Sequence, residues 1–140
     1  MKRSPKRERE TAVRFAERYA RAGSPVLDII EREVVGANVG LDGYTTIAQA
    51  RRLARELRLT RDARLLDVGA GNGWPGLYII GLTRCRAVLC DVPAGAARNA
   101  ADRARRTRTA RRCEIVRASA SALPFQTGSF DAIVHTDVMC

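Results

Sequence analysis

Glycines and acids concentrate in one short segment, and their spacing points to a binding loop. The segment reads Leu65-Leu66-Asp67-Val68-Gly69-Ala70-Gly71-Asn72-Gly73-Trp74-Pro75-Gly76. An apolar strand that ends in an acid, continues into alternate glycines and then enters a helix is typical of a nucleotide-cofactor loop. Glycine has no Cβ, so the backbone can turn sharply and lie against a ligand. The start of the following helix offers unpaired N–H groups as donors.

A second acid lies where such a loop needs one. Asp91 follows Gly71 by 20 positions and ends the next predicted strand. A carboxylate at that place can accept hydrogen bonds from both hydroxyls of a ribose. The loop and the acid together therefore predict a nucleotide-type cofactor rather than an ordinary strand-to-helix turn.

The glycine pattern alone leaves the cofactor open. Residues 71–76 also fit the dinucleotide pattern GxGxxG, which is a weak signal by itself. Asp67 argues against a pyrophosphate, because its charge at the mouth of the strand would repel that group. Pro75 also lacks an N–H that a pyrophosphate would use. A ligand with an ammonium or sulfonium group is favoured, and an NAD(P)-binding protein stays as the weaker alternative.

Four short apolar runs supply the strands that must hold these residues. We expect strands at residues 64–68, 86–91, 114–117 and 131–135, and helices at residues 75–83 and 94–106. Strands that alternate with helices predict an α/β fold with a mostly parallel sheet and right-handed crossovers.

About 60 residues of predicted helix and loop precede the first strand. Residues 1–7 suggest a basic, frayed tail, and apolar residues at spacings of three and four predict a helix from Glu8 to near Gly23. We therefore expect an N-terminal tail and helical cap over residues 1–60, followed by a cofactor-binding domain over residues 61–140.

Capping signals open two more helices within this N-terminal part. Ser24 and Pro25 supply a hydroxyl cap and a first-turn proline. The helix that follows has an apolar stripe made of Val26, Leu27, Ile30 and Val34. Thr46 and Gln49 have the capping-box spacing, which predicts a third helix with an apolar face.

The glycine segment resembles motif I of the class I S-adenosylmethionine-dependent methyltransferases, hydrophobic-acid-hydrophobic-Gly-x-Gly-x-Gly. Residues 118–125 and 129–134 are similar to two further family motifs, G-D-A-x-x-L-P-F and S-F-D-x-I/V, and Asp91 stands where the family has its ribose-binding acid. The resemblance implies a Rossmann-like sheet with strand order 3-2-1-4, an N-terminal helical cap and S-adenosyl-L-methionine as the cofactor.

The resemblance also implies which residues meet the cofactor. They are Asp67, Gly69, Ala70, Gly71, Gly73, Asp91, Val92, Ser119 and Ala120. Ser119 departs from the family, which usually has Asp there to accept from the adenine amino group. Its hydroxyl can still accept a hydrogen bond, although more weakly than a carboxylate. The N–H of Ala120 stays available to the adenine ring, and residues 43–46 are expected to reach the cofactor.

The activity implied by the resemblance is in-line transfer of a methyl group from the sulfonium to an acceptor, which we expect to be a small molecule. Holding the reactants in line can contribute roughly 7–11 kcal/mol. His135 and Asp137 follow the fourth strand, where the family places residues near the methyl group, and they are the candidate catalytic residues. His135 could act as a base for an oxygen or protonated nitrogen acceptor. The alternatives are a polar strand-end residue beside the cofactor or a buried neutral imidazole.

The family sheet normally adds three strands after the fourth, whereas this sequence stops at Cys140. We therefore expect a C-terminally truncated domain whose fourth strand is an open edge, which invites pairing with another strand. A partner chain or self-association at that edge would complete the sheet. The alternative function is a non-catalytic S-adenosylmethionine-binding fragment or partner subunit.

The net charge of +10 rests on 23 Arg and only 2 Lys. Because phosphate binding would not exclude Lys, a GC-rich coding bias explains this excess more simply than selection for a polyanion does. The arginine-rich stretch of residues 98–117 is expected to be a solvated surface away from the cofactor. A nucleic acid is therefore not the expected partner, although it stays as the alternative for this stretch.

Length and composition fit one globular domain. The chain has 140 residues, of which 46% are hydrophobic and 29% charged. No apolar run approaches the roughly 20 residues of a membrane helix, and the N-terminus lacks the apolar stretch of a signal peptide. We expect a cytoplasmic protein without a membrane partner. Four cysteines and one histidine show no zinc-site spacing, so no metal is predicted and the thiols are expected to be free.

Overall fold

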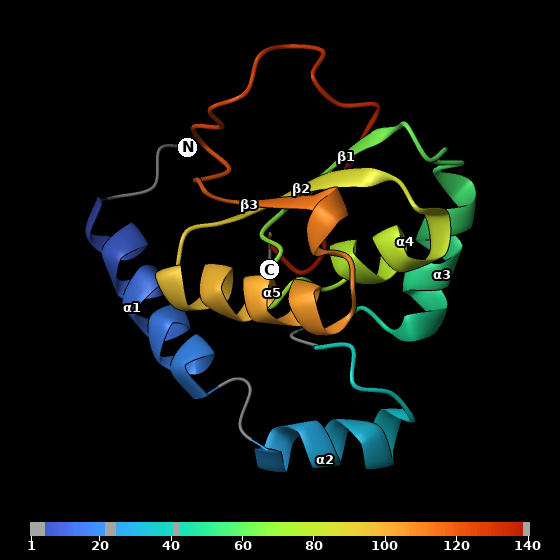
Figure 1. The fold of residues 1–140 in the computed structure, drawn as a ribbon. Helices are drawn as coiled ribbons and strands as arrows, with labels where there is room; N and C mark the ends of the chain where they lie inside the picture. The colour runs from blue at the N-terminus through green and yellow to red at the C-terminus, as the bar shows by residue number, and fades with distance from the viewer. Residues whose placement is uncertain (1–4, 22–24, 41–42, 139–140) are drawn as a thin grey trace.

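The computed structural model describes residues 5–21, 25–40 and 43–138. Its helices and strands, in chain order, are α1 (Pro5–Arg21), α2 (Pro25–Val35), α3 (Ile47–Glu56), β1 (Arg64–Val68), α4 (Gly76–Thr83), β2 (Arg86–Asp91), α5 (Ala94–Arg106), the 3-10 turn η1 (Ala110–Arg112), β3 (Cys113–Arg117) and β4 (Ala132–Val134) (Figure 1). From residue 64 onward, the bounds agree with the sequence predictions to within one residue. No helix in the described ranges is long and apolar enough to cross a membrane.

The four strands form one parallel sheet in the order β3-β2-β1-β4, which confirms the expected fold class and strand order. β1 lies inside the sheet, where Leu66 is paired with Val88 of β2 and with Ile133 of β4. Because the strands are parallel, the segments that follow them meet at one edge and the segments that precede them meet at the other. The two edges have different chemistry, as described below.

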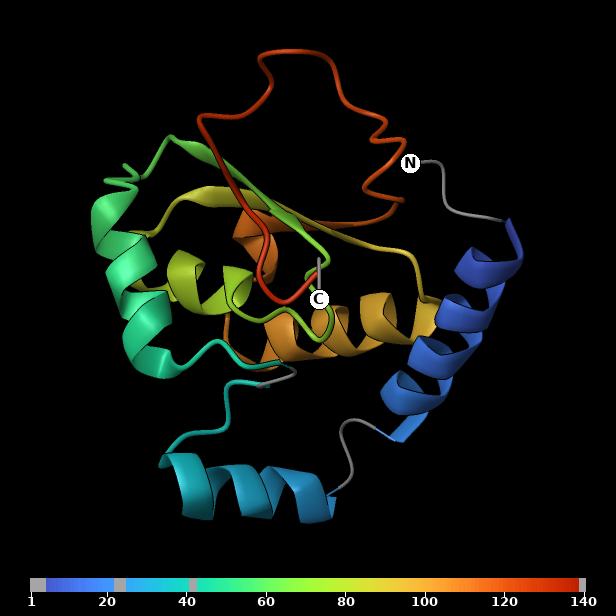
Figure 2. The ribbon, with the colours of Figure 1, turned by 180° about the vertical axis from the view of Figure 1, so that it is seen from behind.

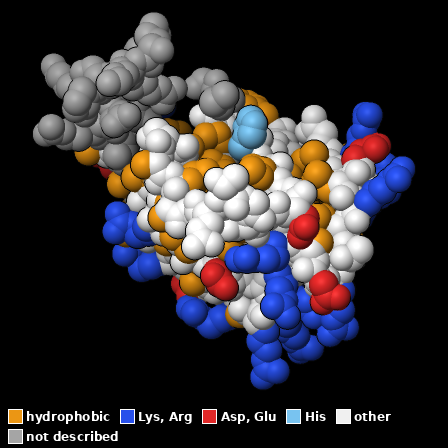
Figure 3. Space-filling model, turned by 90° about the horizontal axis from the view of Figure 1, so that it is seen from above, with side chains coloured by type: hydrophobic (Ala, Val, Ile, Leu, Met, Phe, Trp, Pro, Cys, Tyr) orange, Lys and Arg blue, Asp and Glu red, His pale blue; other side chains and the backbone are white. Residues whose placement is uncertain are grey.

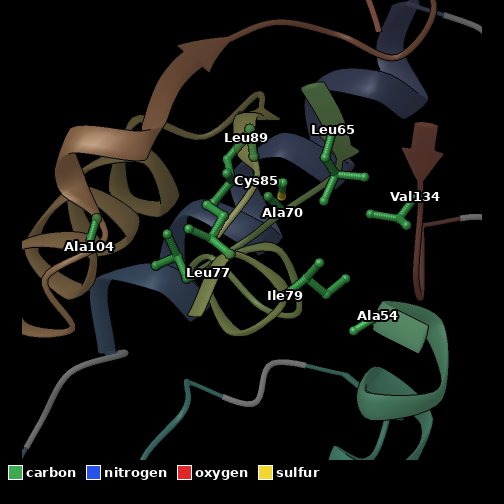
Figure 4. Close-up of a cluster of buried hydrophobic side chains, with 11 residues drawn as sticks. Ala54, Leu65, Ala70, Leu77, Ile79, Cys85, Leu89, Ala104 and Val134 are labelled. Atoms are coloured by element: carbon green, nitrogen blue, oxygen red, sulfur yellow. The ribbon is translucent and has the colours of Figure 1, made fainter. Parts of the chain in front are cut away.

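Helices α3, α4 and α5 cover one face of the sheet (Figures 1 and 2). The core between them is almost purely aliphatic, with Leu65 and Ile79 fully buried (Figure 4). Its buried members are Ala54, Leu65, Ala70, Leu77, Ile79, Ile80, Cys85, Ala87, Leu89, Ala104 and Val134. Each buried Leu or Ile contributes roughly 1.5–3 kcal/mol, so this cluster is the main stabilising layer.

The opposite face of the sheet is covered by the long segment of residues 118–131 (Figure 2). Its aromatic side chains Phe125 and Phe130 meet edge-to-face with ring centroids 5.1 Å apart. They pack with Leu123 against the outward side chains of the two central strands. Segment 118–131 therefore acts as a second covering layer, although it contains no helix.

Helix α1 begins earlier than the sequence suggested. It starts at Pro5, so the prediction of a frayed tail over residues 1–7 was wrong for residues 5–7. Proline is favoured in the first turn, and the Lys, Arg and Glu residues that follow are good helix formers. Gly23 and Ser24, the predicted end and cap, lie outside the described residues. Tyr19 is the buried anchor of this helix, and a Cβ on Gly95 of α5 would crowd against it.

Helix α2 does not bury its apolar stripe. Val26 is 64% exposed and Ile30 49% exposed, so the predicted stripe does not reach the core at these positions. The side chains of Leu27 and Val34 lie outside what the structure describes. The contacts that attach α2 are polar: the Asp28 carboxylate lies 3.7 Å from the Arg106 guanidinium. Its position apart from the sheet in Figures 1 and 2 explains why the stripe stays exposed.

Helix α3 follows its sequence signals closely. The Gln49 N–H donates to the Thr46 hydroxyl at 3.2 Å, and the Thr46 N–H donates to the Gln49 side chain at 2.7 Å. This is the predicted capping box. Ala50 and Ala54 are buried on the predicted apolar face. The helix packs against α4 and so brings the loop before it, residues 43–46, close to the site edge of the sheet.

Candidate functional site

The segments that follow β1, β2, β3 and β4 meet at the C-terminal edge of the sheet (Figure 1). They carry the predicted site residues: the glycine loop after β1, Asp91 at the end of β2, Ser119 after β3, and His135 and Asp137 after β4. In parallel α/β sheets this edge is where ligands bind. The topology therefore brings together residues that lie up to 70 positions apart in the sequence.

Asp91 locks the glycine loop. Its Oδ2 accepts a hydrogen bond from the Gly71 N–H at 2.8 Å, and its Oδ1 accepts one from the Val92 N–H at 2.7 Å. Burial raises the pKa of Asp91 above its usual value, and the N–H donors of Gly71 and Val92 oppose that rise. The carboxylate is half-buried, so part of it still faces outward.

The loop backbone is folded tightly against β2. The N–H groups of Gly69 and Ala70 both donate to the Cys90 carbonyl, at 2.8 and 3.1 Å. Gly69, Gly71 and Gly73 have φ angles of 73°, 51° and 95°. Side-chain-bearing residues rarely adopt such angles, so glycine is required at these positions by the turn itself.

Asp67 lies beneath the loop and does not face an open pocket. It is 1% exposed, and its Oδ2 accepts from the Gly76 N–H at the start of α4 at 2.9 Å. Its Oδ1 is buried without a hydrogen-bond partner among the described residues. Burial raises the pKa of Asp67 to about 8; the Gly76 hydrogen bond opposes this rise and the charge of Asp91 adds to it. The sequence argument needed this acid to present its charge to a ligand, and the structure instead shows a buried carboxyl that supports the loop.

The chain itself covers the start of the glycine loop. Val138, which follows β4, lies against Gly69, where a Cβ would overlap its side chain. The small hollow lined by Gly71, Asp91, Leu89, Ala97 and Ile115 lies between the sheet and α5 and has no room for a water molecule. The loop and its acid are thus assembled, and Val138 lies over the start of the loop.

Asp137 joins the end of β4 to the N-terminal part of the chain. Its Oδ2 accepts three hydrogen bonds, from the Tyr44 N–H at 2.9 Å, the Thr45 N–H at 3.1 Å and the Thr45 hydroxyl at 3.0 Å. A Cβ on Gly43 would overlap the same carboxylate. We call this contact between Asp137 and residues 43–45 the clasp.

Trp74 fastens the same loop from the other side. Its Nε1–H donates to the Thr45 carbonyl at 3.0 Å, and its ring contacts that of Tyr78 with centroids 5.3 Å apart. The indole is 4% exposed, so this hydrogen bond lies away from solvent. Residues 43–46, which the sequence expected to reach the cofactor, are held by Asp137 and Trp74 at the site edge.

The remaining predicted site residues lie at the surface. Ser119 and Ala120 are exposed after β3, and the Ser119 hydroxyl lies 2.8 Å from that of Ser121. His135 is exposed at the end of β4; the single histidine is visible on the upper face in Figure 3. These residues share the edge with Asp91 but make no direct contact with it in the described structure.

Sequence reasoning missed two asparagines that brace the loop. The Asn99 Nδ2 of α5 donates to the Asn72 Oδ1 at 3.0 Å and to the Tyr19 carbonyl of α1 at 2.9 Å. Asn72 is 6% exposed, so its Oδ1 accepts this hydrogen bond inside the protein. The only sequence signal for it was a polar residue between two glycines.

The chain matches the methyltransferase domain family over residues 65–140, more than half of its length. The matched region contains the sheet, the glycine loop and Asp91. The chain belongs to this family. Membership confirms the resemblance to the class I S-adenosylmethionine-dependent methyltransferases, and S-adenosylmethionine is the cofactor of that family. No similar protein was found among curated sequences.

Solved methyltransferases share the fold at low sequence identity. A geranyl diphosphate methyltransferase in complex with GPP and sinefungin has a TM-score of 0.72 and 17% identity, over 89% of this chain and 54% of that one. A SAM-dependent methyltransferase from Geobacter sulfurreducens in complex with S-adenosyl-L-homocysteine has a TM-score of 0.64 and 19% identity, over 79% and 43%. A SAM-dependent methyltransferase from Thiobacillus denitrificans, also in complex with S-adenosyl-L-homocysteine, has a TM-score of 0.62 and 18% identity, over 81% and 44%. The chain spans about half or less of the length of each.

Proposed function

We propose that this methyltransferase-family chain binds S-adenosyl-L-methionine at the C-terminal edge of its sheet and takes part in methyl transfer to a small molecule. The observation that carries the proposal is the bond between the Asp91 carboxylate and the Gly71 N–H at 2.8 Å. It fixes a glycine loop and a ribose-type acid side by side, which an ordinary turn does not require. We further propose that residues 1–60 act as the cap and residues 61–140 as the cofactor-binding domain.

The hydrogen-bonding capacity of Asp91 fits a ribose. A carboxylate has about four lone-pair positions, and Asp91 uses one on each oxygen for the N–H groups of Gly71 and Val92. Each oxygen can therefore still accept from one hydroxyl. The exposed Ser119 hydroxyl and Ala120 N–H lie after the neighbouring strand, on the side where an adenine would extend.

The loop residues Gly69, Ala70, Gly71 and Gly73 supply close backbone approach rather than side-chain contacts in this proposal. Asp67 acts as a positioning residue, because its contact is the Gly76 N–H beneath the loop. Val138 lies against Gly69, so a cofactor that contacts the loop backbone at Gly69 requires this segment to move. The clasp lies next to this segment and would follow its motion.

S-adenosylmethionine supplies an electrophilic methyl group on a sulfonium, and the acceptor lone pair forms the new bond as the bond to sulfur breaks. His135, exposed at the end of β4, is placed to take a proton from an oxygen or protonated nitrogen acceptor. Asp137 is a positioning residue, because its Oδ2 is already engaged by the Tyr44 and Thr45 donors of the clasp. Holding the reactants in line is the main task of the chain.

Calorimetry tests cofactor binding directly. We expect S-adenosylmethionine and S-adenosylhomocysteine to bind, NAD not to bind, and Asp91→Ala to weaken binding about 100-fold, because two charge-assisted hydrogen bonds are lost. Asp62→Ala removes an exposed acid outside the site and is the matched control. Asp91→Asn, checked by circular dichroism, separates loss of the ribose contact from misfolding. Tight NAD binding, or equal affinities for the Asp91 and Asp62 variants, would contradict the proposal.

The open sheet edge at β4 favours a second candidate, a cofactor-binding fragment or partner subunit without turnover of its own. β4 lies at the end of the sheet and pairs only with β1 in the described structure, and Ile133 is 58% exposed there. A partner strand could add to this edge. Size-exclusion chromatography with and without S-adenosylmethionine, combined with a turnover assay on candidate small-molecule acceptors, distinguishes the two. Turnover by the isolated monomer would exclude the second candidate.

A further inference from the structure

The N-terminal edge of the sheet, opposite the candidate cofactor site, carries a row of arginines. Arg64 begins β1 and is paired with Arg86, which begins β2. Ala87 is paired with Cys113 of β3, so Arg112, which precedes Cys113, lies beside Arg86. Neighbouring strands are about 4.8 Å apart, so the row places three positive side chains on consecutive strands.

Loops beside this row contribute further arginines and form a groove of about 840 Å³. Seven arginines line it, against a single acid, Glu114. The arginines are Arg61, Arg64, Arg84, Arg86, Arg108, Arg111 and Arg112. In Figure 3 many of the blue side chains lie toward the lower and right-hand margins of the view. We call this set the arginine groove.

The groove differs from what the sequence predicted. The stretch of residues 98–117 was expected to form one solvated surface, but Arg103 is 7% exposed and donates to the Asn38 side chain at 2.8 Å. Three arginines of that stretch, at 108, 111 and 112, instead join four from other segments. The parallel topology makes the cluster, because it brings the starts of three strands to one edge.

Some of these arginines build the groove and others are available to a ligand. Arg112 Nη1 donates to the Arg84 carbonyl at 2.7 Å and to the Arg61 carbonyl at 3.3 Å, which fixes the two flanking loops. Arg86, Arg108 and Arg111 are exposed and have no ion pair with another described residue. The structure therefore holds a shaped, positively charged groove with uncompensated guanidinium groups.

We propose that the arginine groove binds the phosphodiester backbone of a single-stranded nucleic acid. Guanidinium groups match phosphate oxygens in bidentate geometry, and several in a row suit a ligand with phosphates at regular intervals. The lining includes no aromatic residue on which bases could stack, so binding is expected to be independent of base sequence. A concave groove suits a chain better than a flat membrane surface.

The inference does not rest on the proposed function. The groove and the glycine loop lie at opposite edges of the sheet and share no residue. Nucleic-acid binding should therefore not need S-adenosylmethionine. It would place a polyanion next to the domain while leaving Asp91 and the clasp accessible.

The test is fluorescence anisotropy of the full chain with fluorescein-labelled oligo(U) and oligo(dT) of equal length, with a labelled poly-glutamate peptide as the third probe. We expect both oligonucleotides to bind and log K to fall linearly with log salt concentration, by about 0.7 for each phosphate neutralised on a single strand. Equal affinity for RNA and DNA identifies the backbone as the common ligand. Equal or tighter binding of poly-glutamate would overturn the proposal in favour of an acidic protein.

A matched pair of variants locates the binding. Arg86→Gln/Arg111→Gln removes two exposed charges from the groove, and Arg32→Gln/Arg98→Gln removes two exposed charges elsewhere. We expect the groove variant to lose at least about tenfold in affinity and about 1.4 from the salt slope. The control should lose much less. Equal losses in both, with unchanged circular dichroism, would mean that general charge attraction explains binding and would refute the groove as the site.

Discussion

The loops at the two edges of the same sheet are held mainly by different kinds of polar side chain. At the C-terminal edge, Asp67, Asp91 and Asp137 accept hydrogen bonds from backbone N–H groups of loops and of a helix start. At the N-terminal edge, Arg112 donates to backbone carbonyls of loops that follow α3 and α4. Helices in right-handed crossovers point their N-termini toward one edge and their C-termini toward the other, so unpaired donors and acceptors are sorted in the same way.

The comparison teaches that polar side chains at each edge have two uses, support of the backbone and recognition of a ligand. Asp67 and Arg112 are supports, since their partners lie within the chain. Asp91 combines both uses, because it holds Gly71 and keeps capacity for hydroxyls. Arg86 and Arg111 are free for recognition in the described structure. Substitutions that separate these uses test the comparison.

The largest effect is expected from Asp67→Asn, measured as stability against pH. The pKa of Asp67 is raised in the folded chain to about 8, above its ordinary value of 3.8, so the unfolded chain gives up this proton first as pH rises. Folding stability should therefore fall between about pH 4 and pH 8, by up to about 1.4 kcal/mol per pH unit. Asn retains an acceptor for the Gly76 N–H and has no proton to lose. Urea unfolding across this range should show a steeper fall of stability with pH in the native chain than in the variant; identical slopes would contradict the assignment.

Asp137→Ala should have the next largest effect. It removes the acceptor of all three hydrogen bonds of the clasp, and we expect a loss of about 1–3 kcal/mol in unfolding free energy. Hydrogen exchange at the Tyr44 and Thr45 amides should accelerate as well. Asp131→Ala, which removes a carboxylate bonded to the Arg64 N–H at the other edge, is the control. If it accelerated exchange at Tyr44 equally, the clasp would not be a local contact.

The smallest effects on stability are expected within the arginine groove, where they distinguish an arginine that supports the backbone from one that is available to a ligand. Arg112→Gln should lower stability by about 1–2 kcal/mol, because two carbonyl contacts are lost. Arg111→Gln should change stability by less than about 0.5 kcal/mol, because its side chain is exposed and unpaired. Thermal unfolding of the two variants measures the difference. Equal destabilisation would remove the distinction drawn between the two arginines.

The local signals in the sequence were sufficient for the elements around the site. Alternate glycines, the Thr46 capping box and the apolar runs depend on neighbours a few residues apart, so they predicted the loop, α3 and the strands. The sequence could also have predicted the face of the sheet toward which the Asp67 side chain points. Side chains alternate along a strand, and Leu65 faces the helices, so Asp67 must face them too.

Contacts between distant segments could not be predicted in this way. Asp137 and Thr45 are 92 positions apart, and their contact depends on where α3 packs. The arginine groove draws on three separate segments, each just before or at the start of a strand, and no one of them shows a special pattern. The exposed stripe of α2 shows the converse, since Val26 and Ile30 have helical spacing but no surface to pack against.

Trp74 gives the clasp an optical reporter. It is the only tryptophan in the chain, its ring is buried, and its N–H is hydrogen-bonded to the Thr45 carbonyl. The emission wavelength of an indole depends on its contact with water and on the partner of its N–H. Ultraviolet fluorescence of the unlabelled protein therefore reports whether residues 43–46 are in contact with Trp74. The indole reports its surroundings during the few nanoseconds of its excited state. The protein needs no added dye for its cap to be followed in real time.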